Sequence, residues 1–299
     1  MKQLQLTLVG LLLLVTSATA CDVCGCNISN NGTGILAAYR YNTIGMRWYN
    51  NIFQQSPDYG NTKDYFQTLE FAAQFHPTDR LRLSIFQPIK WHQQFGENEV
   101  QDASLFGLGD TRLMANYALL QNVRVVGAST LYWEVGGGMK LPTGAYDDRI
   151  HLRDLPENFN IGNASWGYIA QSTLVYNTLD VGLVLNGSYQ HHQAARTDYQ
   201  FGDQLTANVM VFAQKSFTKK WRTVPFGGIY YEQVQVDRLY NDRAAHGTGG
   251  KGWFASTGVN FIFDQWLVSA TYTHPFQQSY TDDEMIAKPR MAVELNYVF

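Results

Sequence analysis

The segment at residues 290–299, RMAVELNYVF, alternates apolar and polar residues with a period of two. Five apolar residues would share one face of a strand: Met291, Val293, Leu295, Tyr297 and Phe299. Arg290 and Glu294 fall on the opposite face, because successive side chains of a β-strand point to opposite sides. One face therefore suits lipid and the other suits water, which is the pattern of a strand in a transmembrane β-barrel.

The same pattern recurs along the chain, which a single edge strand of a soluble sandwich would not explain. We expect twelve strands, near residues 43–54, 64–76, 80–93, 107–119, 129–140, 164–176, 179–192, 203–217, 221–235, 251–263, 266–278 and 288–299. Segments of this length are sufficient to cross a membrane as tilted strands. The aromatic Phe299 on the last segment resembles the signal read by the bacterial barrel-assembly machinery, which we expect to be a partner.

The connections between these segments alternate in length. Short turns are expected at residues 76–79, 177–180, 218–220 and 264–265, with a somewhat longer connection at 121–128. Long polar loops are expected at residues 55–63, 94–106, 141–163, 193–202, 236–250 and 279–287. Short periplasmic turns that alternate with long external loops are typical of outer-membrane barrels. The sequence thus predicts an all-β protein, a transmembrane antiparallel up-and-down barrel over residues 43–299, with both ends of the barrel chain on the periplasmic side.

Composition agrees with this class. Aromatic residues make up 14% of the chain and charged residues only 16%, yet the mean hydropathy is −0.24. Alternating apolar and polar positions produce this combination. Most of the seven Trp residues fall near segment ends, which favours an aromatic girdle at the membrane interfaces. A net charge of −3 and a pI of about 6.1 argue against a nucleic-acid partner.

The first twenty residues have the features of a secretory signal peptide. Lys2 is followed by ten apolar residues, Leu6 to Val15, and then by small residues up to Ala20. Cleavage after Ala20 would make Cys21 the first residue of the mature chain. We therefore expect a signal peptide at residues 1–20, a periplasmic or lumenal segment at 21–42, and insertion of the barrel into the bacterial outer membrane, with its lipids as partners.

All three cysteines lie in the stretch CDVCGCN, at positions 21, 24 and 26. In one hypothesis, Cys21 is the lipidated residue of a lipoprotein. In a second, Cys24 and Cys26, with or without Cys21, bind a soft metal such as Cu(I) or Zn, since thiolates prefer such ions. In a third, Cys21 and Cys24 form a disulfide in the oxidising periplasm and one thiol is left over.

Two stretches resemble a particular family. GLGD at residues 107–110 opens one predicted strand, and GGGMKLPTG at residues 136–144 closes the next. This pairing resembles outer-membrane transporter barrels similar to the meta-pathway phenol-degradation family. The stretch CDVCGCN followed by GILAAYRYNTIGMRWYNNIF resembles a subgroup of Bacteroidetes-type bacteria with an N-terminal CxxCxC. The resemblance implies a barrel that passes small, often hydrophobic or aromatic molecules, and it implies no particular cargo-binding residues.

The predicted inner face carries charges of both signs. We expect the following side chains to face the lumen: Arg47, Glu70, Arg82, Lys90, Asp110, Arg112, Glu134, Lys140, Arg290 and Glu294. In one interpretation these groups pair across a narrow barrel and fill it; in the other they form a constriction that selects small polar solutes. The three glycines at 136–138 indicate either a bend in the wall or the close approach of another segment, such as residues 27–42.

The sequence therefore favours a passive channel for small-molecule cargo and no enzyme. A non-conducting, plugged barrel with a structural or metal-handling role is the alternative. An outer-membrane hydrolase is a second alternative, although neither a G-x-S-x-G nor an H-E-x-x-H motif is present.

Overall fold

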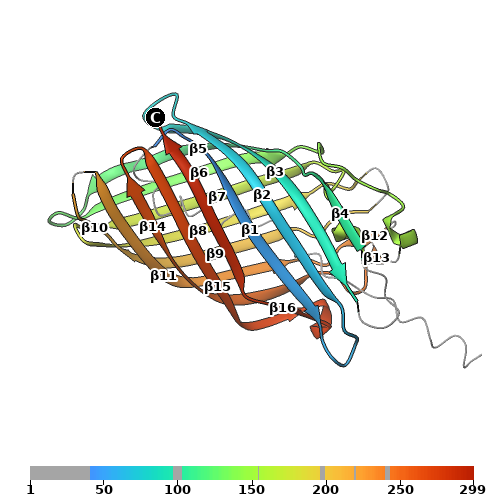
Figure 1. Ribbon diagram of the computed structural model, residues 1–299. Coiled ribbons are helices and arrows are strands. Elements are labelled where there is room, and N and C mark those ends of the chain that lie inside the picture. The colour runs from blue at the N-terminus through green and yellow to red at the C-terminus, as the bar shows by residue number, and fades with distance from the viewer. Residues whose placement is uncertain (1–40, 97–102, 154, 196–198, 219, 240–242) are drawn as a thin grey trace, which may run out of the picture.

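The chain forms a single tilted β-barrel, seen from the side in Figure 1. This computed structural model describes residues 41–96, 103–153, 155–195, 199–218, 220–239 and 243–299. The segment expected to be a signal peptide and the three cysteines therefore lie outside the described residues, as does almost all of segment 21–42. Within the described ranges, no helix is long and apolar enough to cross a membrane.

The described residues form seventeen strand elements, and the main sheet closes on itself as twelve antiparallel barrel strands. Three of these barrel strands are divided into two elements, so each of the twelve is called a stave. The uninterrupted staves are β1 (Thr43–Gln55), β2 (Lys63–Phe75), β3 (Leu81–Phe95), β6 (Thr130–Lys140), β7 (Gly167–Asn177), β8 (Val181–His192), β11 (Trp221–Val234), β14 (Gly250–Phe263) and β15 (Trp266–Tyr280). The divided staves are β4 (Ala103–Leu108) with β5 (Arg112–Arg124), β9 (Gln204–Ala213) with β10 (Lys215–Ser216), and β16 (Met285–Ala287) with β17 (Arg290–Val298). The predicted fold class is confirmed.

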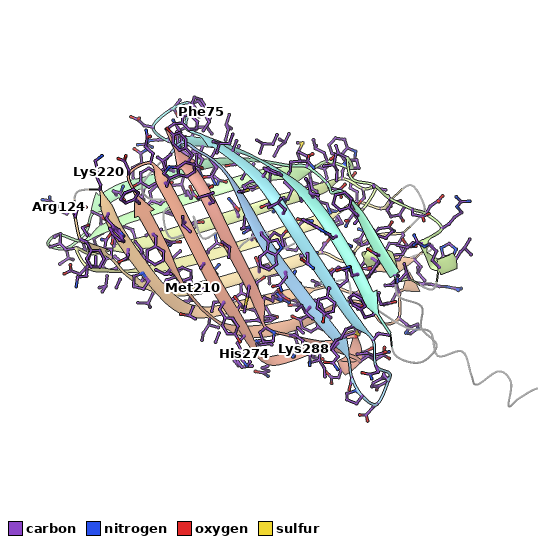
Figure 2. All side chains as sticks on the ribbon, viewed as in Figure 1. Phe75, Arg124, Met210, Lys220, His274 and Lys288 are labelled. Carbon is purple, nitrogen blue, oxygen red and sulfur yellow. The ribbon has the colours of Figure 1, made fainter. Side chains whose placement is uncertain are left out.

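Each stave pairs with its neighbours in the chain, and the first stave pairs with the last. Thr43 of β1 lies opposite Val298 of β17, and Asn50 lies opposite Met291. Short turns gather at one end of the barrel, where Figure 2 labels Phe75, Arg124 and Lys220. The opposite, long-loop end carries the helical turns η2 (Ile150–Arg153), η3 (Glu157–Phe159) and η5 (Thr281–Asp283), and the small hairpin of β12 (Arg238–Leu239) and β13 (Arg243–Ala244).

Some boundaries differ from the sequence-based expectation. The segment expected to be an external loop at 94–106 already contains the start of β4, and β5 extends to Arg124, into the expected connection. The expected loop 279–287 contains β16, which pairs with the end of β1. Short strands of this kind carry too few residues for a period-two pattern to be recognised.

The outer surface consists of apolar side chains between two aromatic girdles. Toward the short turns, Trp221 contacts Phe217 and Phe263 edge-on, and Trp266 contacts Tyr297. Toward the long loops, ring pairs join Tyr65 to Phe95, Trp91 to Phe106 and Tyr231 to Trp253. An apolar band with aromatic girdles at both interfaces is the outer surface of a barrel that lies in a membrane.

The stave made of β4 and β5 is interrupted at Gly109–Thr111. Phe86 of β3 pairs with Arg112 and Ile89 pairs with Leu108, so two residues of β3 face three residues of the other stave. One of those two is Pro88, which has no N–H to donate to the neighbouring strand. The extra residue forms a bulge, and the bulge turns the Asp110 carboxylate into the barrel, where it is buried.

Outside the barrel wall, at the long-loop end, the connections pack on one another. Tyr199, Phe201 and Ala245 form a buried cluster, with Tyr146 packed against it. The fully buried Asp237 carboxylate accepts hydrogen bonds from the Tyr199 hydroxyl and, at 2.5 Å, from the backbone N–H of Gly202. Burial raises the pKa of Asp237 to about 7, although the Gly202 hydrogen bond opposes the shift.

We expect this loop cluster to become less stable as the pH rises from about 4 to about 7. In that window the ordered loops bind a proton at Asp237 that the opened loops release, so stability falls by up to about 1.4 kcal/mol per pH unit. The opening free energy, measured by hydrogen exchange at the Gly202 amide and corrected for intrinsic rates, should show this slope. Asp237→Asn should remove it; an identical slope in this variant would exclude Asp237 as the origin.

Candidate functional site

The ten charged residues expected to face the lumen lie on the barrel staves or, for Asp110, at the interruption between β4 and β5. Nine of the ten are buried, namely Arg47, Glu70, Lys90, Asp110, Arg112, Glu134, Lys140, Arg290 and Glu294. The side chain of the tenth, Arg82, is 12% exposed. Alternation along each strand directs these residues inward. They belong to several different staves.

Opposite charges pair in groups, both between neighbouring staves and over an intervening stave. Glu70 of β2 accepts hydrogen bonds from Arg47 of β1, at 3.1 Å, and from Arg112 of β5. Glu134 of β6 accepts hydrogen bonds from Arg82 and, at 2.8 Å, from the Tyr132 hydroxyl. Unpaired charges would be very costly at such burial, and Glu70 and Glu134 each lie against at least one arginine.

One further ion pair was missed in the sequence. Arg290 donates two hydrogen bonds of 2.7 Å to the carboxylate of Glu232 in β11. The hydroxyls of Tyr280 and Tyr230 donate to the same carboxylate at 2.6 and 2.9 Å. Glu232 lies between Tyr231 and Gln233 and falls on the inward-facing side of β11. The alternation along that strand would therefore have identified it as a lumenal charge.

The interior is tightly packed at mid-barrel. Thr68 and Asn260 point inward from different staves and are fully buried, whereas the lining of a wide aqueous pore would be accessible to water. A cavity beside Glu70, Lys90 and Asp110 has a volume of about 20 Å³, which is room for about one water molecule. The described side chains beside these charges therefore leave little open space.

The connection between β6 and β7, residues 141–166, folds back into the barrel from the long-loop end. Ile150 and Phe159 of this plug loop are fully buried. The ring of Phe159 lies 5.6 Å from that of Phe66 and 5.7 Å from that of His92, measured between centroids. Phe66 and His92 are buried, inward-facing residues of β2 and β3, so the plug loop reaches inside the wall.

Asp110 holds the plug loop at its base. Its carboxylate accepts hydrogen bonds from the backbone N–H of Gly144 and of Asn163, both at 2.8 Å, and Lys140 Nζ lies 3.7 Å away. Gly144 and Gly162 approach so closely that a Cβ on either would lie 2.7 Å from the backbone of the other. Only glycine fits at this crossing, which explains the glycine that closes the stretch KLPTG.

The GLGD and KLPTG stretches thus meet in one junction. Thr111, next to Asp110, donates its backbone N–H to the Thr143 hydroxyl at 2.9 Å, and Leu141 donates its own to the Thr111 carbonyl at 2.8 Å. The sequence showed the two stretches on neighbouring strands, but their contact depends on the bulge at Gly109–Thr111. The junction joins the barrel wall to the plug loop.

The glycines at 136–138 have a local explanation. A Cβ on Gly136 would overlap the Asn116 side chain, and one on Gly138 would overlap Met114. Both neighbours belong to β5 and point into the barrel, so they fill the space that the glycines leave. The approach of residues 27–42, the other explanation, concerns a segment that lies almost wholly outside the described residues.

The proposed roles of the cysteines concern residues that the structure does not describe. Lipidation of Cys21, metal binding by Cys24 and Cys26, and a disulfide therefore all stay predictions. In the part of the chain that is described, no group of three His, Cys, Asp or Glu side chains is placed to hold a metal ion.

Comparison with known proteins places the fold. The model of the family "Putative MetA-pathway of phenol degradation" matches residues 59–281, a stretch that includes the junction and the plug loop. The chain belongs to this family. No curated protein matches the sequence significantly. Membership in the family and the apolar outer belt together make the chain an outer-membrane β-barrel.

Two solved structures share the architecture of this family barrel. A COG4313 outer membrane channel from Pseudomonas putida F1 matches with a TM-score of 0.65 and 15% identity, over 87% of this chain and 96% of that one. The β domain of the Bordetella autotransporter BrkA matches with a TM-score of 0.53 and 9% identity, over 87% of this chain and 100% of that one. At such low identities, the likeness shows the fold alone.

Proposed function

We propose that the protein is a passive outer-membrane channel for small molecules, and that the plug loop closes its external mouth in the conformation described here. The observation that carries the proposal is the position of this loop, which enters the lumen but is no stave of the wall. Because its ends are held at one junction, residues between them can move without opening the hydrogen-bonded cylinder.

Family membership and the likeness to a solved outer-membrane channel support transport over catalysis. The family description refers to phenol degradation, which favours small, hydrophobic or aromatic cargo. The lumenal charges would then act on polar groups of the cargo. Membership in the Bacteroidetes-type CxxCxC subgroup stays a proposal based on the quoted N-terminal residues.

The second candidate is a non-conducting barrel with a structural or metal-handling role. The buried ion pairs favour it, because Arg47–Glu70 and Arg290–Glu232 occupy the interior and rigidify it. A hydrolase has less support. The Nδ1–H of His92 donates to the Phe159 carbonyl, and the Nδ1–H of His192 donates to the Gly202 carbonyl. His191 lies beside Asp203.

Excision of residues 146–161 should separate the two candidates. The Gly162 N–H donates to the Ala145 carbonyl at 2.7 Å, so a Gly-Ser turn can join these two residues and preserve the junction. In planar bilayers we expect rare conductance steps from the intact protein and frequent, larger steps from the shortened one, because the mouth is then open.

Removal of residues 57–60, which are exposed and lie outside the lumen, serves as the matched control. It should leave the conductance of the intact protein unchanged. A folded 146–161 excision variant that never conducts would contradict the channel and support the filled structural barrel.

A further inference from the structure

The place that Phe159 occupies inside the barrel has the character of a binding site for an aromatic ring. Its ring is fully buried and is met edge-on by Phe66 and His92, whose own rings are 4.8 Å apart. Edge-to-face contacts at these distances are favourable for aromatic rings beyond the area that they bury. Phe66 and His92 thus form a preformed aromatic site for the Phe159 ring, called the Phe159 seat below.

The seat continues into a larger aromatic surface. Phe66 meets Phe53 at 6.4 Å, and Phe53 meets Tyr280 at 5.5 Å, both in edge-to-face geometry. The guanidinium of Arg290 lies 5.7 Å from the Phe53 ring and 4.4 Å from that of Phe254. A ring that replaced Phe159 would therefore enter a region in which further aromatic rings line the inner face of the wall.

A buried polar atom at the seat has no hydrogen-bond partner among the described residues. His92 Nδ1 lies 2.8 Å from the Phe159 carbonyl, which can only accept, so the hydrogen is on Nδ1. In the neutral ring, Nε2 is then an acceptor, and it is buried without a hydrogen bond. The phenyl ring of Phe159 has no donor to offer it. A ring that carries a hydroxyl or amino group could supply the missing hydrogen bond.

We propose that the Phe159 seat is a binding subsite for a single aromatic ring that bears a hydrogen-bond donor. Phe159, which is attached to the plug loop, competes with the solute for this site. The ring of the solute packs against Phe66 and His92, and its donor binds His92 Nε2. Binding displaces Phe159, so the solute itself shifts the plug loop toward the open state. This proposal rests on the proposed channel function and names the class of cargo for its external mouth.

Phe159→Ala tests the site directly, because it removes the competitor and leaves an apolar cavity, and such cavities bind benzene-sized rings. We expect phenol, measured by calorimetry in detergent, to bind this variant at least tenfold more tightly than it binds Ile150→Ala. Ile150→Ala, a fully buried site in the same loop, controls for loosening of the loop and for partition of phenol into micelles.

Two comparisons test the chemistry of the seat. Phenol should bind Phe159→Ala about three- to tenfold more tightly than toluene, the worth of about one net hydrogen bond. Addition of His92→Leu should abolish that preference. Cyclohexanol, which has the donor but no aromatic ring, should bind more weakly than phenol. Equal binding of phenol to both alanine variants, or of all three probes to Phe159→Ala, would overturn the subsite.

Hydrogen exchange in the unaltered protein tests the competition. Phenol should accelerate exchange of the Asp147 and Asn160 amides, which donate to the Asn160 side chain and to the Glu157 carbonyl inside the loop. Unchanged exchange under saturating phenol would overturn the role of Phe159 as competitor. If Phe159→Ala fails to fold, Phe159→Leu serves as the smaller change. Failure of the channel would appear separately, as an absence of conductance after loop excision.

Discussion

Glu232→Gln is expected to lower the free energy of unfolding by about 3–5 kcal/mol, because it leaves the buried guanidinium of Arg290 without its counter-charge. Both residues are about 5% exposed, and Arg290 donates two hydrogen bonds to this one carboxylate. Tyr230 and Tyr280 would also lose a charged acceptor. Urea unfolding in lipid vesicles, followed by Trp fluorescence, measures the change.

Removal of both charges should cost far less than removal of one. The double variant Glu232→Leu with Arg290→Met should lie close to the unaltered protein, since buried ion pairs often have little net value over apolar residues of similar size. Asp264→Asn breaks an exposed pair with Lys220 and should change stability by less than about 1 kcal/mol. A small effect of Glu232→Gln alone would show that water reaches this pair.

Val209→Arg is expected to destabilise the barrel by about 2–4 kcal/mol, because it places a cation on the lipid-facing side near the middle of the membrane. Val209 lies near the middle of β9, is 48% exposed, and pairs with Leu185 and Ile229 of the neighbouring staves. The same unfolding measurement in vesicles gives the change.

The matched control is Val126→Arg, in the turn after β5, where the side chain is 72% exposed. That turn lies beyond the apolar belt, so we expect a change close to zero. Equal effects at the two positions would contradict the placement of the belt in lipid.

The period-two pattern predicted most of the wall, because lipid outside and polar groups inside constrain every strand in the same way. Glu70 in β2 and Arg112 in β5 both lie where the alternation places them, and both strands pair with β3, which lies between them. What the pattern could not predict is the interruption at Asp110. A bulge shifts the parity by one residue, and its position depends on Pro88 in a neighbouring stave.

The plug loop was beyond sequence reasoning for a different reason. Residues 141–163 were expected to be an external loop, since their composition is polar and irregular. Ile150 and Phe159 are isolated apolar residues in that stretch, and no periodicity marks them as buried. The position of Phe159 follows from long-range contacts with Phe66 and His92, which adjacency in the chain does not reveal.

The seam between β1 and β17 has a kinetic consequence. Arg47 and Glu294 lie opposite each other across it, although about 250 residues separate them in the chain. Until that last stave arrives, β1 has a free edge, and free edges are prone to aggregate. Barrel closure should therefore be a late and slow event in assembly, during which the unpaired backbone of β1 stays exposed.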